Sequence, residues 1–182
     1  VADSQTWQNF AALLERTLDI EQLLALSQMA SLPQGAWPAL PDGDAGRGLT
    51  LAMADDDAFN FYYPDNIMLL ERTGVEIIRF SPLRESRLPD CQMVWLGGGY
   101  PELYAARLAE NTTMLASLRE AHRRGVAIYA ECGGLMYLGS TLEDSEGVTH
   151  RMANVIPGHS RMGKRLTRFG YCEAQARQPT LL

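Results

Sequence analysis

The sequence predicts an α/β protein whose mostly parallel sheet is doubly wound, with helices covering both faces. Two observations support this prediction. Short, continuous apolar runs alternate with helical patterns from Leu49 onwards, and parallel strands that are buried on both faces read as such runs. Residues able to do chemistry also follow three of these runs, and functional groups in this class gather outside the carboxyl ends of the strands.

Each predicted strand and helix has its own signal. The apolar run 49–54 predicts the first strand, and Pro64 with Gly74 predicts a helix that begins at the proline and ends at 72. Gly125 closes another predicted helix. The remaining expected elements are strands at 75–80, 93–96 and 126–130 and helices at 102–109 and 113–124.

The first 47 residues differ in composition from the rest of the chain. Apolar spacing predicts helices in 6–29, divided where Asp19 and Gln22 resemble a capping box. Prolines and glycines crowd 32–48, which is linker composition. We therefore expect a helical segment with a Pro/Gly linker at 1–47 and one α/β domain at 48–182, with both ends cut from something longer.

Composition excludes several function classes. The net charge of −6 gives no electrostatic footprint for nucleic acid or an anionic membrane. No apolar run is long enough to span a bilayer, and the chain begins with no signal-peptide pattern. Cys91, Cys132 and Cys172 are odd in number and scattered. This argues against a disulfide framework or a cysteine metal site and predicts a cytoplasmic protein.

Cys132 lies where a predicted strand turns into a predicted helix. Its small neighbours Ala130, Gly133 and Gly134 would tolerate the strained turn of a nucleophile elbow. The N–H groups and positive dipole end of the following helix would lower the pKa of the thiol. Free cysteine is also among the most often buried residue types. The pattern therefore supports a nucleophile and a small core residue about equally.

Three glycines, Gly97, Gly98 and Gly99, end another predicted strand. Glycines at such a place let backbone N–H groups approach a ligand closely, and these groups can form an oxyanion hole. The N–H of Gly133 would supply a second donor. For an isolated triple glycine, a tight turn before a helix is the better explanation. The run is not a phosphate loop, because no Gly-Lys-Ser/Thr follows it.

Acidic and aromatic residues follow the first predicted strand. Asp55, Asp56 and Asp57 could bind a metal or meet a partner domain, but such acids usually favour a helix N-terminus and water. The aromatic side chains within 59–63 are more typical of core and interface packing than of a cofactor site. We therefore predict no metal site here.

The three histidines offer no convincing base for a cysteine nucleophile. His122 belongs to the polar end of a predicted helix, His150 to a hairpin after an acidic turn, and His159 to a loop. None has an acidic neighbour at a spacing that suggests a relay. The residues taken alone therefore predict a nucleophile and an oxyanion hole without their base.

Several motifs together resemble those of the cobyrinic acid a,c-diamide synthases. In chain order they are DDAFNFYYPDN, FSPL, LGGGYPE, AECGGLMYL and GY at 170–171. The resemblance covers 49 to about 177, and the chain is most similar to the C-terminal glutamine amidotransferase domain of such a synthase. These domains are class I-like, cysteine-nucleophile amidotransferases on a flavodoxin-like fold.

The resemblance implies a glutaminase in which the thiolate of Cys132 attacks the side-chain amide of glutamine and releases ammonia. It implies an oxyanion hole made by Gly133 and a backbone N–H from Gly98 or Gly99. Ammonia would pass to the enzyme's own N-terminal synthetase domain, which uses ATP and Mg²⁺ to activate the a and c carboxylates of a corrinoid. The residues expected to face substrate or that domain are Tyr100, Glu131, Asp56, Phe59 and Tyr62.

The resemblance also implies what this chain does without. The synthetase domain's P-loop would precede residue 1, so we expect 1–47 to hold that domain's last helices and no cofactor to bind to this chain. The family's catalytic histidine would follow Tyr171, so we expect the domain at 48–182 to be truncated and to hydrolyse glutamine poorly alone. A homodimer is a candidate assembly. Two alternatives stay open: another cysteine-elbow amidotransferase, such as a cobyric acid synthase, and a non-catalytic binding domain on the same fold.

Overall fold

The computed structural model describes residues 3–29, 43–163, 171, 173 and 175, and the chain divides into two compact units, Val1–Ala39 and Leu40–Leu182. The first unit contains two helices, α1 (Ser4–Thr17) and α2 (Ile20–Met29). The predicted break between them is confirmed, because the Asp19 carboxylate accepts a hydrogen bond from the N–H of Gln22 at 2.9 Å.

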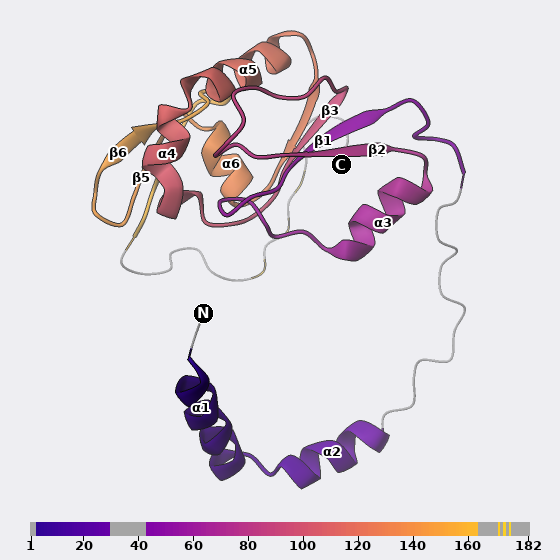
Figure 1. Cartoon of the computed structure of the whole chain (residues 1–182), viewed down its shortest axis with the longest axis vertical. Helices are drawn as coiled ribbons and strands as arrows, with labels where there is room; N and C mark the ends of the chain where they lie inside the picture. Colours follow the sequence, from indigo (N-terminus) through magenta and orange to yellow (C-terminus); the bar gives the residue numbers. More distant parts are fainter. Residues whose placement is uncertain (1–2, 30–42, 164–170, 172, 174, 176–182) are drawn as a thin grey trace. The chain divides into compact units, whose positions relative to one another are not determined.

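The strands and helices of the second unit follow the predicted order from β1 to α6 (Figure 1). Its elements are β1 (Thr50–Ala54), α3 (Pro64–Arg72), β2 (Glu76–Phe80), β3 (Met93–Leu96), the 3-10 helix η1 (Pro101–Tyr104), α4 (Ala105–Glu110), α5 (Thr112–Arg123), β4 (Ala127–Ala130), α6 (Gly133–Leu138), β5 (Thr141–Glu143), β6 (Thr149–Arg151) and β7 (His159–Arg161). Each predicted strand and the helix after β1 lie within one residue of their expected bounds.

The four predicted strands form one parallel sheet in the order β2-β1-β3-β4. In this sheet Leu51 pairs with Ile77 on one side and with Met93 on the other, and Leu96 pairs with Ala130 on β4. Because all four strands run the same way, their carboxyl ends lie at one edge of the sheet. The residues that follow β1, β3 and β4 are therefore brought to the same edge.

The two central strands of the sheet, β1 and β3, are largely buried and pack against apolar clusters on both faces. Alternate strand residues such as Ala52 and Val94 belong to one apolar cluster with residues of α4, α5 and α6. Their neighbours Met53 and Trp95 belong to a second cluster, which residues of α3 join. Successive side chains of a strand point to opposite faces, so both faces need apolar residues and the strands read as continuous apolar runs. Figure 1 shows α3 apart from α4, α5 and α6, and the predicted fold class is confirmed.

A second, three-stranded sheet follows α6, in the order β6-β5-β7. β5 and β6 are antiparallel and pair Leu142 with His150, which confirms the hairpin predicted around that histidine. β7 runs parallel to β5 and pairs His159 with Thr141. The prediction that His159 lies in a loop is therefore wrong. Three-residue strands show too few positions for an alternating pattern to be recognised.

Within the described part of the chain, no helix is both long enough and apolar enough to cross a bilayer.

Candidate active site

Cys132 lies on a strained corner between β4 and α6. Its φ of 49° and ψ of −114° place it in a backbone conformation that non-glycine residues rarely adopt. The residue is exposed, so the alternative of a small core residue is wrong. Such strain persists only where the surrounding structure enforces it, and two glycines of α6 supply that enforcement.

Gly134 lets α6 begin directly against the end of β3. A Cβ on Gly134 would lie 2.1 Å from the carbonyl oxygen of Leu96, a distance that no side chain tolerates. The Gly134 N–H lies near two carbonyl oxygens, that of Gly97 at 3.0 Å and that of Glu131 at 2.8 Å. These contacts fix the first turn of α6, and with it the neighbouring Cys132, at the end of β3.

The glycine loop, which we define as 97–99, lies beside Cys132. A Cβ on Gly98 would be 3.6 Å from the Cβ of Cys132, and one on Gly133 would be 3.3 Å from the backbone nitrogen of Gly99. Both Gly99 and Gly133 are buried, and neither N–H donates a hydrogen bond to another described residue. Two buried donors next to an exposed thiol are the parts that an oxyanion hole requires.

The segment after β1 is joined to the glycine loop and to Tyr100 by backbone hydrogen bonds. The Gly98 carbonyl accepts hydrogen bonds from the N–H groups of Asn60 and Phe61, each at 3.1 Å, and the Tyr100 N–H donates to the Ala58 carbonyl at 3.0 Å. The same region explains Tyr100, whose half-exposed ring packs edge-on against Phe61 with centroids 5.2 Å apart. Two motifs that are distant in the sequence, FNFYY and GGGY, thus contact each other in the fold.

Glu131 precedes Cys132, and its carboxylate turns towards β3. The indole N–H of Trp95 donates to it at 3.3 Å. The Trp95 ring contacts Tyr62 edge-on with centroids 4.9 Å apart, and its centroid lies 6.4 Å from that of Tyr129. Glu131 and Tyr62 therefore both contact Trp95 on β3.

Asp56 ties the ends of β1 and β2 together. Its carboxylate accepts hydrogen bonds from Ala58 N–H at 2.9 Å, Ser81 hydroxyl at 2.7 Å and Leu83 N–H at 2.9 Å, and the residue is only 8% exposed. The expectation that this acid simply meets water is wrong. The sequence carried a signal for it, because an aspartate often accepts from the backbone N–H two residues on. Phe59 is also buried, packed on Tyr137 with centroids 5.3 Å apart.

The histidines differ from expectation in one respect. His122 is exposed near the end of α5, as predicted. No spacing in the sequence suggests an acidic neighbour for any histidine, yet Nε2 of His150 lies 2.8 Å from Oδ2 of Asp144. This hydrogen bond lowers the pKa of Asp144 below its usual range. The hairpin turn brings the two together, which linear spacing does not reveal. Within the described residues, no histidine is hydrogen-bonded to Cys132 and no cluster of three metal-binding side chains occurs.

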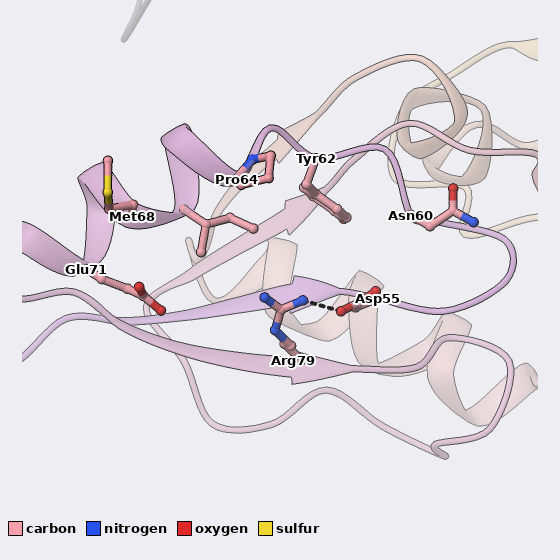
Figure 2. Close-up of a pocket in the computed structure, with 8 residues that line it drawn as sticks. Asp55, Asn60, Tyr62, Pro64, Met68, Glu71 and Arg79 are labelled. Atoms are coloured by element: carbon pink, nitrogen blue, oxygen red, sulfur yellow. Dashed lines mark hydrogen bonds and ion pairs between the residues drawn. The ribbon is translucent and has the colours of Figure 1, made fainter.

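A pocket of about 340 Å³ opens at the β1 and β2 side of the same sheet edge (Figure 2). An ion pair between Arg79 and Asp55 spans the strand ends beneath it, and Tyr62 borders it from the loop before α3. The pocket is lined by Asp55, Asn60, Tyr62, Pro64, Ile67, Met68, Glu71 and Arg79. The pocket could not be predicted from the sequence, because it forms only where residues 55–71 fold against Arg79 of the neighbouring strand β2.

The chain is similar to several curated proteins that share one name. The chain is 72% identical, over its whole length, to the cobyrinate a,c-diamide synthase of Salmonella typhimurium and covers 40% of that protein. It is 43% identical over 97% of its length to the synthase of the same name from Listeria monocytogenes and covers 38% of it. A relative of that name from Dehalococcoides mccartyi is 40% identical over 96% of this chain. The chain thus spans about two fifths of the length of these relatives.

One solved structure, a putative peptidase E from Listeria monocytogenes EGD-e, matches with a TM-score of 0.48 and 14% identity over 61% of this chain and 64% of the other. That likeness is too slight to carry weight. A family description, the CobB/CobQ-like glutamine amidotransferase domain, matches residues 50–181. This range contains the sheet, the elbow and the glycine loop. The chain belongs to the family of CobB/CobQ-like glutamine amidotransferases.

Proposed function

We propose that this domain hydrolyses glutamine, with Cys132 as the nucleophile, and supplies the ammonia for an amide ligase. The observation that carries the proposal is the elbow itself. An exposed thiol on a strained strand-to-helix corner has beside it two backbone N–H groups, those of Gly99 and Gly133, that donate to no other described residue. Strain of this kind is retained where it positions a reacting group, and it favours this role over that of a non-catalytic binding domain.

In the proposed reaction, the Cys132 thiolate attacks the side-chain amide carbon of glutamine and forms a C–S bond. The electron pair of the carbonyl moves to its oxygen, and the N–H groups of Gly99 and Gly133 stabilise the oxyanion. Collapse of this intermediate breaks the C–N bond, and the nitrogen takes up a proton and leaves as ammonia. Water then attacks the glutamyl thioester, which yields glutamate and regenerates the thiol.

The proton transfers need a general acid–base group, and no histidine among the described residues is hydrogen-bonded to Cys132. All three histidines of this sequence, His122, His150 and His159, are among the described residues, and His150 is paired with Asp144. We propose that the group is a histidine of the longer family protein, as the family resemblance implies. We further propose that the ammonia passes to an ATP- and Mg²⁺-dependent synthetase domain. No described residue of this chain is assigned to either cofactor.

The relatives' names suggest the acceptor, because all three are called cobyrinate a,c-diamide synthase. We propose that the ammonia amidates the a and c side-chain carboxylates of cobyrinic acid in cobalamin biosynthesis. An amidotransferase domain supplies the same small molecule to any ligase, so the acceptor must be tested directly.

A chimaeric enzyme tests this acceptor. This chain replaces the matching segment of the Salmonella relative, and the purified chimaera receives ATP, Mg²⁺, glutamine and either cobyrinic acid or its a,c-diamide. We expect cobyrinic acid to gain two amide groups, seen as product mass by mass spectrometry, at a rate within about tenfold of the unsubstituted relative. Amidation of the a,c-diamide alone would instead support a cobyric acid synthase. Failure with glutamine but not with ammonium chloride would reject the proposed glutaminase.

A further inference from the structure

The hydroxyl of Tyr62 lies between the carboxyl ends of two neighbouring strands. It accepts a hydrogen bond from the Gly97 N–H at 2.9 Å and donates one to the Ala54 carbonyl. The β1–β3 register pairs Met53 with Trp95, and one further ladder step would bring the Gly97 N–H to the Ala54 carbonyl directly. The tyrosine hydroxyl therefore takes the place of one ladder bond and holds the two strand ends apart.

The Tyr62 side chain is fixed in this place by its surroundings. A Cβ on Gly97 would lie 2.5 Å from carbons of the Tyr62 ring, so only glycine allows the ring and the backbone to approach so closely. The ring also packs edge-on against Trp95. Burial raises the pKa of the Tyr62 hydroxyl well above its usual value. The hydroxyl consequently keeps the proton that it needs to donate and accept at once.

The bond to Gly97 bears directly on the proposed chemistry, since Gly97 begins the glycine loop. Gly98 and Gly99 follow it and lie beside Cys132 and Gly133. We infer that Tyr62 is a positioning residue for the oxyanion hole, whose hydroxyl sets where the Gly99 N–H lies relative to the Cys132 thiol. This inference rests on the proposed glutaminase function. It assigns Tyr62 a role within the domain, in addition to any contact with a second domain.

Loss of the hydroxyl is expected to move the loop. In Tyr62→Phe the Gly97 N–H and the Ala54 carbonyl lose their shared partner, and buried backbone groups rarely stay unpaired. The ladder can pair them by closing over the missing oxygen, which draws Gly97 towards β1 and away from its place beside the elbow. A misplacement of about 1 Å in reacting groups can cost about 100-fold in rate.

Two thiol reagents separate this role from general effects on Cys132. The first is the chloroketone analogue of glutamine, in which CH₂Cl replaces the amide NH₂. The thiolate first adds to its ketone carbon and forms an oxyanion adduct. The sulfur then bonds to the methylene carbon, chloride leaves, and the first C–S bond breaks as the ketone re-forms. The second is iodoacetamide, whose single displacement step develops no oxyanion. The ratio of the two alkylation rates therefore reports on the oxyanion hole, and both depend equally on thiol ionisation and exposure.

The experiment measures both rates on the 182-residue chain by mass spectrometry of the Cys132 peptide. For Tyr62→Phe we expect the chloroketone rate to fall about 10- to 100-fold and the iodoacetamide rate to stay within about twofold. Two matched variants control for the loss of a tyrosine hydroxyl. Tyr63 is 76% exposed, and the buried Tyr137 hydroxyl has no hydrogen-bond partner among the described residues. Tyr63→Phe and Tyr137→Phe should leave both rates within about twofold.

Two outcomes would overturn the inference. An unchanged chloroketone rate in Tyr62→Phe would show that the hydroxyl does not position the hole. Equal losses with both reagents would mean that the thiol itself has changed. A melting temperature measured by circular dichroism should stay within about 5 °C of that of the unsubstituted chain, as expected for one lost hydrogen-bonded bridge. If the chloroketone alkylates Cys132 of the unsubstituted chain no faster than iodoacetamide does, the proposed function fails. If it does react faster but Tyr62→Phe does not change its rate, only the role of Tyr62 is refuted.

Discussion

Replacement of Cys132 with alanine is expected to lower glutamine-dependent amidation by the chimaeric enzyme at least about 1000-fold. Alanine keeps the size of a small side chain at the strained corner but removes the sulfur that forms the thioester. Amidation with ammonium chloride should stay within about twofold of the unsubstituted chimaera, because the ligase step receives ammonia from solution. Product formation with each nitrogen source, followed by mass spectrometry, measures both activities in one preparation.

Cys91→Ala serves as the matched control. Cys91 packs against the larger apolar cluster, and burial raises the pKa of its thiol, so it is a poor source of thiolate at neutral pH. Its replacement should leave glutamine-dependent amidation within about threefold. Full glutamine-dependent activity in Cys132→Ala would remove Cys132 from the reaction and leave the strained elbow without its proposed role.

Replacement of Gly134 with alanine is expected to destabilise the domain and displace the elbow together. The new Cβ would lie 2.1 Å from the Leu96 carbonyl oxygen and 2.7 Å from the Leu96 Cβ, so α6 must move away from β3. Overpacking of this kind costs about 1–3 kcal/mol of unfolding free energy, and the moved helix carries Gly133 with it. Urea unfolding should show the lower stability, and the chloroketone should alkylate Cys132 at least about tenfold more slowly.

Leu135→Ala provides the comparison on the same helix turn. Leu135 is 52% exposed, and surface substitutions usually change stability by less than about 0.5 kcal/mol. Its unfolding free energy and its alkylation rates should therefore stay close to those of the unsubstituted chain. A Gly134→Ala variant as stable and as reactive as Leu135→Ala would show that α6 tolerates the extra carbon and that its close approach to β3 is unnecessary.

Much of the main sheet could be predicted, because a strand that is buried on both faces is apolar at consecutive positions of the sequence. The runs that contain Met53 and Trp95 are continuously apolar, and each residue has an apolar cluster to join. Helix starts also leave local signals, such as Asp19 before α2. The elbow was predictable as strand, turn and helix, yet only the structure, in which Cys132 is exposed, excludes a small core residue there.

Features that depend on tertiary contacts escaped prediction. Nothing in the spacing of Asp144 and His150 indicates their hydrogen bond, which a hairpin turn creates. The burial of Asp56 depends on Ser81, which lies 25 positions further along the chain. The place of Tyr62 in the ladder depends on two strand ends that are far apart in sequence. The family resemblance implies that Tyr62 faces substrate or another domain, while its hydroxyl bonds belong to this domain.

The central claim is that Cys132 is the nucleophile of a glutamine site in this domain. Alkylation of the unsubstituted chain by the glutamine chloroketone, followed by peptide mass spectrometry, tests it most directly. We predict one adduct per chain, located on Cys132, with a rate that saturates as the reagent concentration rises and falls when free glutamine is added. An adduct distributed over Cys91 and Cys132, or a rate that neither saturates nor responds to glutamine, would contradict the claim.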